Sequence, residues 1–417
     1  MASHRIRDID APGAASCTDQ LRRVIAVATE ASPGRHALPG ERSTDDAVTQ
    51  RPNLPVNIWA FFGALIVAFE VFVLIRWVSG PFFVRVPAGP SDPPTWMKVI
   101  LTAWQVASIP ATLSLLYWFV IRPWWRERHI GIDGLLVIAF LTMWFQDPIS
   151  SYGGHWFTYN TWMFNRGSWV NSIPGWNSFG RPGAMLSEPI LFTPFAYCYI
   201  FVIVMFFGSW LMRKVQARFP QMSKLGLMGV CYVVMFFVDV VLEGLLWLPM
   251  GIFAYQGGHW GIFADTYHKY PLHEGLTIGA TFAGVACLRY FTNDKGQMLV
   301  ERGAEEIRGG NVKRTVVRAL ATIAAVQGLF FITYNVPNFW VGMHSTAWPV
   351  DLQKRSYFTS GICGEGTGRA CPGPAVPLNR NDNSNPERGG APYLGSDGKL
   401  VVPPDTHLPS TVPFERK

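Results

Sequence analysis

The chain has 417 residues, of which 49% are hydrophobic, 15% are charged and 17 are Trp. So few charges among so many apolar and aromatic residues are typical of a polytopic membrane protein, and they argue against a chain of ordinary soluble domains. The net charge of +7 does not indicate a nucleic-acid partner. The basic residues lie in the tails and in the loops between apolar segments, where such residues orient a membrane protein.

Seven apolar segments predict an all-α polytopic membrane protein with about seven transmembrane helices. Residues 1–55 lack the apolar core of a signal peptide, so we expect a disordered cytoplasmic tail there. The membrane domain is expected over residues 56–345. Residues 346–417 are rich in Pro and Gly and are expected to form an irregular extracytoplasmic tail. The expected helices are Ile58–Val78, Trp96–Ile121, Gly131–Phe145, Pro189–Met212, Leu225–Met250, Leu272–Phe291 and Val316–Tyr334.

The distribution of Lys and Arg predicts the orientation in a cell membrane. The loops after the second, fourth and sixth segments are rich in basic residues, as is the N-terminal tail, whereas the other loops hold few. Because cytoplasmic loops carry the excess of positive charge, the N-terminus is expected in the cytoplasm and the C-terminus outside. Outside the cytoplasm, Cys363 and Cys371 can form a disulfide or remain two free thiols, and the sequence leaves both alternatives open.

The fifth apolar segment carries the most informative residues. Asp239 and Glu243 are spaced by four residues and share a helix face, which Trp247 continues. A carboxyl group in hydrocarbon is costly and must face a bundle interior, a partner or water, so this pair predicts a functional site. A structural hydrogen bond is the alternative. Pro249 and Gly251 are expected to end the helix.

A tetrapeptide, Gly-Gly-His-Trp, occurs twice, at residues 153–156 and 257–260. Each copy follows an apolar helix that carries an acid, which predicts that His155 and His259 lie near one cavity with Glu188 and Glu274. Each acid also has a simpler interpretation, since Glu188 and Glu274 suit helix N-termini and Asp147 suits a helix stop before Pro148. The candidate substrate-binding residues are Trp247, Trp156, Trp260, Tyr255 and Asp147; the candidate catalytic residues are Glu243, Asp239, Glu274, Glu188, His259 and His155.

The outer loop from Pro148 to Leu186 is unusually rich in aromatic residues and Asn. Trp and Tyr are enriched at membrane interfaces, so an interfacial belt is one interpretation. The number of rings in a single loop favours a folded lid over a cavity.

Several stretches of this chain resemble the AveC-type spirocyclase family of actinobacterial polyketide biosynthesis. They are Phe145–Pro148, Gly153–Trp156, Gly183–Pro189 and Asp239–Trp260, within a resemblance that extends from about Ile58 to Trp348. The resemblance implies a polytopic membrane protein that closes dihydroxy-ketones into spiroketals. It implies no catalytic motif, so the candidate residues above come from the sequence pattern alone.

Such a reaction is an acid-assisted cyclodehydration and needs a neutral acid, a carboxylate, aromatic faces and a dry pocket. We therefore expect a cyclase for an apolar hydroxy-ketone, polyketide- or lipid-like, with Glu243 as proton donor and Asp239 as its deeper partner. No cofactor and no metal is expected, because neither a histidine-rich metal pattern nor a phosphate loop is present. The expected partners are the lipid bilayer and the substrate, without nucleic acid; a homo-oligomer is compatible with the sequence. A proton-coupled transporter and a structural membrane partner of a biosynthetic enzyme are the alternatives.

Overall fold

The computed structural model describes residues 55–81, 83–149, 157–175, 186–344, 346–360, 363–365, 371, 393–394 and 400–401. The expected N-terminal tail therefore lies almost wholly outside the described residues, as does most of the C-terminal tail. The helices are α2 (Pro55–Val78), α3 (Thr95–Leu116), α4 (Arg122–Glu127), α5 (Ile132–Met143), α7 (Thr193–Arg218), α8 (Lys224–Asp239), α9 (Leu248–Met250), α10 (Leu272–Tyr290), α11 (Asn311–Phe330), α12 (Val336–Met343), α13 (Val350–Gln353) and α14 (Ser356–Thr359).

Shorter elements join these helices. Three of them are π-helical and continue a neighbouring α-helix: η2 (Tyr117–Ile121), η5 (Val240–Trp247) and η8 (Phe331–Asn335). The 3₁₀ turns are η3 (Trp144–Gln146), η4 (Val170–Ser172), η6 (Leu299–Glu301) and η7 (Ala304–Glu306). Six short strands pair into three ribbons: β1 (Phe157–Tyr159), β2 (Phe253–Tyr255), β3 (Gly261–Ile262), β4 (Tyr270–Pro271), β5 (Tyr393–Leu394) and β6 (Leu400–Val401).

The expected helical membrane fold is confirmed. Within the described residues, six helical stretches are long and apolar enough to cross a bilayer: Pro55–Val78, Thr95–Glu127, Ile132–Ile149, Thr193–Arg218, Lys224–Met250 and Asn311–Gly342. The seventh expected helix is α10, which has 19 residues. It carries Glu274, Thr277 and Thr281 on buried positions and packs against α7 and α8. These polar residues make it less apolar than the other six.

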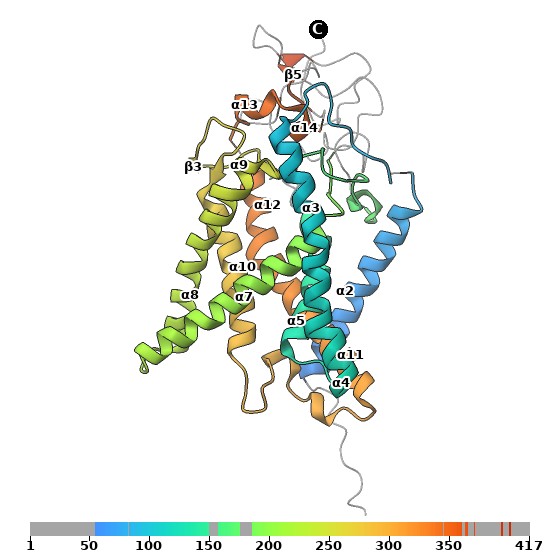
Figure 1. The fold of residues 1–417 in the computed structure, drawn as a ribbon, viewed down its shortest axis with the longest axis vertical. Helices are drawn as coiled ribbons and strands as arrows, with labels where there is room; N and C mark the ends of the chain where they lie inside the picture. The colour runs from blue at the N-terminus through green and yellow to red at the C-terminus, as the bar shows by residue number, and fades with distance from the viewer. Residues whose placement is uncertain are drawn as a thin grey trace, which may run out of the picture. The chain divides into compact units, whose positions relative to one another are not determined.

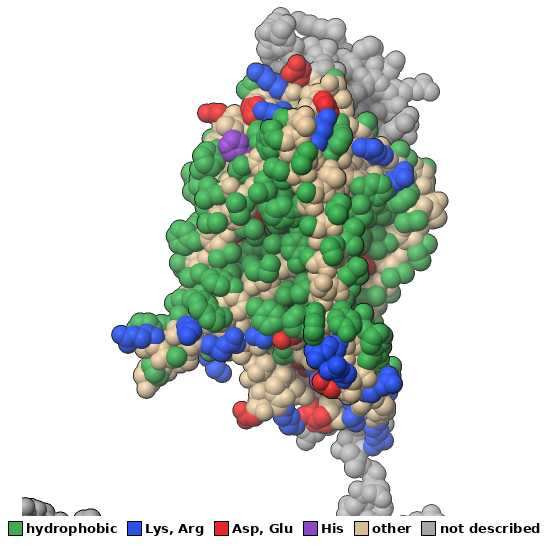
Figure 2. Space-filling model, viewed as in Figure 1, with side chains coloured by type: hydrophobic (Ala, Val, Ile, Leu, Met, Phe, Trp, Pro, Cys, Tyr) green, Lys and Arg blue, Asp and Glu red, His purple; other side chains and the backbone are tan. Residues whose placement is uncertain are grey.

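The bundle has an apolar middle and one basic end (Figures 1 and 2). Hydrophobic side chains form a wide band on the visible face, and below it lie many Lys and Arg side chains near α4, the α7–α8 turn and the α10–α11 connection. The outer face of α2 is typical of a lipid contact, since Phe61, Leu65 and Ile75 are exposed. The three basic loops of the sequence therefore lie at one end of the fold.

At the opposite end, two loops that are distant in sequence pair as strands. β1 and β2 run antiparallel, with Phe157 opposite Tyr255 and Tyr159 opposite Phe253. Asn160 continues this connection, because its backbone N–H donates to the Ile252 carbonyl at 3.0 Å. The described part of the aromatic loop is thus folded and mostly buried, although Phe164 is 45% exposed.

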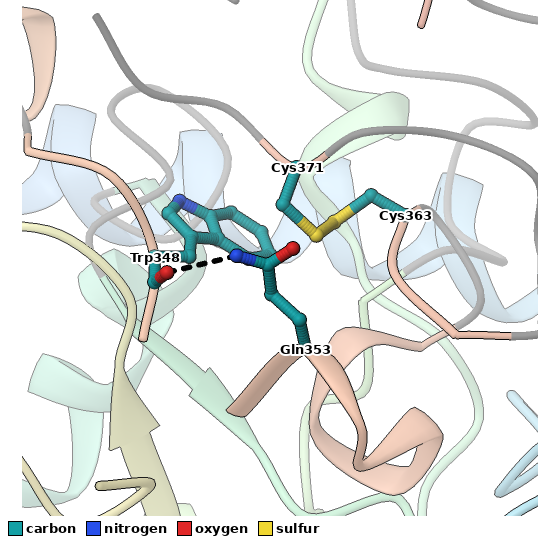
Figure 3. The surroundings of a disulfide bond; sticks show 4 residues. All are labelled: Trp348, Gln353, Cys363 and Cys371. Carbon is teal, nitrogen blue, oxygen red and sulfur yellow. Dashed lines mark hydrogen bonds between the residues drawn. A yellow bond between two sulfur atoms is a disulfide. The ribbon is translucent and has the colours of Figure 1, made fainter. Parts of the chain in front are cut away.

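The last membrane helix continues further than the sequence indicates. It passes from α11 through the π-helical η8 into α12 and ends at Met343, beyond the expected end at Tyr334. α13 and α14 follow, so the first part of the expected irregular tail contains two short helices. Cys363 and Cys371 form a disulfide, which packs near Trp348, and Gln353 donates to the Trp348 carbonyl at 2.8 Å (Figure 3).

Candidate functional site

The helices and the β1–β2 ribbon enclose a narrow apolar cavity. Its volume of about 60 Å³ is room for only a few water molecules. Its walls are mostly aromatic, and its carboxyl groups belong to Asp147 and Glu243. The remaining lining residues are Phe157, Tyr159, Phe192, Thr193, Ala196, Tyr197, Ile200, Phe201, Trp247, Phe253, Tyr255, Ile278, Phe282 and Tyr334.

The helix that carries Asp239 and Glu243 changes its geometry between them. α8 ends at Asp239, and the next eight residues form the π-helical η5. A π-helix bonds residue i to i+5, so its turn holds more residues than the 3.6 of an α-helix. Buried residues recur every four positions through α8 and η5, and the wider turn keeps Glu243 and Trp247 on the same side as Asp239. π-Helical turns occur frequently at functional sites.

The ends of this helix follow the sequence expectation. Ser223 caps its start by accepting a hydrogen bond from the Gly226 N–H at 3.1 Å. The helix stops at Gly251, whose φ of 77° lies in the left-handed region that favours glycine. Asp239, Glu243 and Trp247 are all buried, so the face that they were expected to share is confirmed.

Each of three buried acids accepts a hydrogen bond from a tyrosine. Tyr255 donates to Glu243 Oε2 at 2.5 Å. Tyr270 donates to Asp239 Oδ2 at 2.7 Å, and Tyr197 donates to Asp147 Oδ1 at 2.5 Å. Burial, followed by the nearby charges of Glu243 and Glu274, raises the pKa of Tyr255 well above its usual value. The phenol therefore keeps its proton and remains a donor.

Tyr255 was expected to bind substrate, whereas Tyr197 and Tyr270 were not among the candidates. Tyr197 lies within an apolar segment, where a hydroxyl needs a partner, and this signal could have identified it.

A cluster of three carboxyl groups lies behind one wall of the cavity. Glu243 is within electrostatic range of Asp239 and of Glu274, which stands in the first turn of α10. Asp239 does not line the cavity; it lies behind Glu243 and is completely buried. Asp239 accepts a hydrogen bond from Tyr270 and interacts electrostatically with Glu243 and Glu274. The two acids of the helix therefore belong to a cluster that also includes Glu274, Tyr255 and Tyr270, and their sharing of one proton stays a prediction.

Glycines allow Tyr270 to reach this cluster. A Cβ on Gly244 would come within 3.1 Å of the Tyr270 ring, and one on Gly275 would lie 2.6 Å from the Tyr270 hydroxyl oxygen. Larger residues at these positions would push the ring away from Asp239. The position of the Tyr270 side chain between η5 and α10 thus depends on two residues without side chains.

Asp147, the other carboxyl of the cavity lining, lies next to a further buried acid, Glu188. Asp147 is not a helix stop, because its backbone is α-helical and the helix continues to Ile149. Glu188 is not in a first helical turn, because α7 begins only at Thr193. Burial, followed by the adjacent charge of Asp147, raises the pKa of Glu188 well above its usual value.

Hydrogen bonding at this pair is incomplete. Neither oxygen of Glu188 and only one oxygen of Asp147 receives a hydrogen bond from the described residues. A proton held between the two carboxyl groups would join one oxygen of each, and it is favoured because like charges so close together cannot both ionise easily. The buried acids Asp147, Glu188, Asp239 and Glu243 form no ion pair with a described Lys or Arg.

The second Gly-Gly-His-Trp copy does not reach the cavity. His259 is exposed and its Nε2 lies 2.9 Å from the His344 carbonyl. Trp260 is 81% exposed. Positive φ angles at Gly258 and Trp260 turn the chain here. The repeated tetrapeptide therefore does not place His259 at the cavity, as had been expected. His155 and Trp156 of the first copy lie outside the described residues.

A chain of hydrogen-bonded, buried polar side chains crosses the bundle near the cavity. Gln327 donates to Glu70 Oε1 at 2.7 Å, and Gln146 Nε2 donates to the Gln327 carbonyl at 3.0 Å. Asn335 Nδ2 donates to Gln146 Oε1 at 2.9 Å. Glu70, which lies within the first apolar segment, thus has a hydrogen-bond partner inside the bundle. Sequence analysis singled out none of the three amides.

Among the described residues, no group of three or more His, Cys, Asp or Glu side chains has an arrangement that could hold a metal ion. The geometry instead provides carboxyl groups and phenols around an aromatic cavity. These groups can donate and accept protons and can stabilise a cation.

The fold and this cavity define a polytopic helical membrane protein with a carboxyl-lined site inside its bundle. A family model described as "Spirocyclase AveC-like" matches residues 127–358. This is more than half of the chain, so the chain belongs to the AveC-like spirocyclase family. The match begins at the end of α4, whereas the sequence resemblance was expected from Ile58. Searches of curated proteins and of solved structures gave no significant match.

Proposed function

We propose that this protein is a membrane-embedded cyclase that catalyses acid-assisted cyclodehydration of an apolar hydroxy-ketone, polyketide- or lipid-like. One observation carries the proposal: the Glu243 carboxyl lines an apolar aromatic cavity and lies within electrostatic range of two further carboxyls, those of Asp239 and Glu274. Membership of a family described as spirocyclase-like supports the reaction class.

The reaction begins when one hydroxyl of the substrate attacks the ketone to form a hemiketal. Glu243 then protonates the hemiketal hydroxyl, which leaves as water. The oxocarbenium ion that remains is stabilised by the carboxylate of Glu243 and by the faces of the aromatic lining. A second hydroxyl attacks this cation, closes the second ring and returns its proton to Glu243. The balance is the loss of one water, and the acid is regenerated.

The three-carboxyl cluster supports Glu243 as the acid. Asp239 and Glu274 lie close to it in a site of low dielectric, where adjacent carboxyls cannot all ionise easily. At least one proton is therefore retained in the cluster. Tyr255, bonded at 2.5 Å, orients the carboxyl and can stabilise the carboxylate after proton transfer.

Across the cavity, Asp147 and Tyr197 supply the polar groups of the opposite wall. We assign them to binding the substrate hydroxyls, while Glu188 holds a proton next to Asp147. The cavity, with a volume of about 60 Å³, is too small for a polyketide chain, so substrate binding must open it. The β1–β2 ribbon that carries Phe157, Tyr159, Phe253 and Tyr255 is the wall to move, because it consists of loop segments rather than long helices.

Comparing metabolites of a deletion strain with those of its parent tests this function. The deletion strain is expected to accumulate a compound heavier than the parental product by one water, and the intact gene should restore the parental product. Identical metabolite profiles, or a difference unrelated to water, would contradict the cyclase.

A proton-coupled transporter is the second candidate. The chain of hydrogen bonds from Glu70 through Gln327 and Gln146 to Asn335 favours it. Transport would move a lipid or small metabolite across vesicles without chemical change. The orientation proposed from the basic loops, with the N-terminus in the cytoplasm, applies to both candidates.

A further inference from the structure

A second hollow lies at the basic end of the bundle, far along the helices from the carboxyl-lined cavity. It has about 360 Å³ of space between the start of α5, the start of α11 and the connection from α10 to α11. Its polar lining includes His129, Lys295, Glu305, Arg314 and Arg318. Because α5 and α11 begin here, the hollow lies at the level where the hydrocarbon ends and lipid phosphate groups begin.

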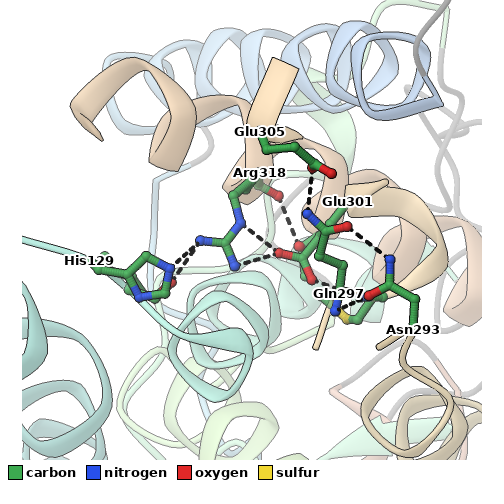
Figure 4. Close-up of polar contacts among 9 residues, drawn as sticks. His129, Asn293, Gln297, Glu301, Glu305 and Arg318 are labelled. Carbon is green, nitrogen blue, oxygen red and sulfur yellow. Dashed lines mark hydrogen bonds and ion pairs between the residues drawn. The ribbon is translucent and has the colours of Figure 1, made fainter. Parts of the chain in front are cut away.

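Arg318 and Lys295 hold the walls of this hollow together, and Figure 4 shows the contacts of Arg318 with His129 and Glu301. Arg318 binds the buried Glu301 through Nε at 2.8 Å and Nη2 at 2.7 Å, and its Nη1 lies 3.0 Å from both His129 Nε2 and the Ile130 carbonyl. Lys295 pairs with Glu305. Burial, followed by the neighbouring Arg318, lowers the pKa of His129, which therefore accepts from Arg318 as a neutral ring. The charges of Arg318 and Lys295 are therefore balanced by those of Glu301 and Glu305.

Arg314 differs from Arg318 and Lys295 in its charged contacts. Its Nε donates to the Ile307 carbonyl at 3.1 Å, and it forms no ion pair with any described residue. This leaves a guanidinium on the wall of the hollow without a counter-charge. The nearest helix-start acid, Asp133, is already paired with Arg289 at 2.7 Å.

Two helix starts add to this positive field. The N-cap residues of α5 and α11 are Gly131 and Gly310, and neither provides a side-chain cap. Gly131 and Asn311, the first residue of α11, both line the hollow. Each helix N-terminus is equivalent to about half a positive charge. Together with Arg314, they amount to about two positive charges. Glu305, the carboxylate in the lining of the hollow, is already paired with Lys295.

We propose that this hollow binds a phosphate group, supplied either by an anionic phospholipid or by a small soluble phosphate. A guanidinium can bind phosphate oxygens with two parallel hydrogen bonds, and free N–H groups at helix starts complete such a site. Basic pockets at this level of a membrane protein are suited to lipid headgroups. The inference does not depend on the cyclase proposal.

The test uses the full-length protein in detergent. Native mass spectrometry compares retention of phosphatidylglycerol with that of phosphatidylcholine of the same acyl chains, and calorimetry measures binding of inorganic phosphate. Arg314→Gln removes the uncompensated charge and keeps an amide that can reach the Ile307 carbonyl. Arg213→Gln is the matched control, because Arg213 is exposed at the same end and does not line the hollow. Circular dichroism melting confirms that both variants are folded.

Preferential retention of phosphatidylglycerol that falls about tenfold or more in Arg314→Gln, but not in Arg213→Gln, would support the site with a lipid as its ligand. Phosphate binding with the same dependence, without lipid preference, would support it with a soluble ligand. Equal retention of both lipids without phosphate binding would overturn the proposal. So would equal losses in both variants, since these would reflect overall charge only.

Discussion

Replacing Glu243 by Gln isolates the proton that the proposed reaction needs. Gln has the size of Glu, and its carbonyl oxygen can still accept the hydrogen bond that Tyr255 donates at 2.5 Å. The side chain is almost fully buried, so an isosteric change preserves the packing with Trp247 and the aromatic lining. The variant should therefore fold and insert, yet it cannot protonate the leaving hydroxyl.

The expected loss of activity in Glu243→Gln follows from the role of Glu243 as the general acid. General acid catalysis contributes about 10²–10⁴-fold, which is about 2.7–5.4 kcal/mol of activation free energy. Tyr255→Phe gives a graded comparison, because it removes one hydrogen bond to a charged group, worth about 1.5–3 kcal/mol. Glu243→Gln should therefore be at least as slow as Tyr255→Phe, and the double variant should be little slower than Glu243→Gln alone.

The assay supplies each variant to the deletion strain and quantifies the accumulated precursor and the dehydrated product by mass spectrometry. Membrane abundance and monodispersity in detergent are measured in parallel. Conversion by well-folded Glu243→Gln at nearly the parental rate would refute the assignment of Glu243 as proton donor. The acid would then be sought in the Asp147–Glu188 pair on the opposite wall.

Three further predictions concern stability, topology and the extramembrane end. Glu188→Gln should stabilise the protein increasingly as pH rises from about 5 to 8, since the raised pKa of Glu188 means that the native state loses stability as the unfolded carboxyl ionises above pH about 4.3; a difference in melting temperature that does not change with pH would contradict this. In sealed cells, an impermeant maleimide should label Asp265→Cys but not Gln221→Cys, and the reverse pattern would invert the proposed orientation. Replacing Cys363 and Cys371 by Ser should cost the local structure about 2.5 kcal/mol, estimated from the eight-residue separation; hydrogen exchange over residues 346–360 should accelerate, and unchanged exchange would show that the disulfide contributes little.

The sequence by itself determined the helices and one face of the site. An apolar bilayer accepts only helices or closed barrels, so long apolar segments translate directly into membrane helices. The spacing of Asp239, Glu243 and Trp247 then defined a common face, and the cost of burying carboxyls indicated that this face turns inward. These conclusions use only local geometry and solvation, which a sequence contains.

Only the tertiary structure decided which tyrosines form hydrogen bonds with the buried acids. Tyr197 and Asp147 are 50 positions apart, and Tyr270 and Asp239 are 31 positions apart, so no local periodicity connects them. The structure also separated His259, which the repeated tetrapeptide had suggested for the cavity, from the acids. Which helices pack together depends on side-chain shapes, the close approach at Gly244 and the wider turn of η5. Those are properties of the packed bundle, and they determine which polar groups meet inside it.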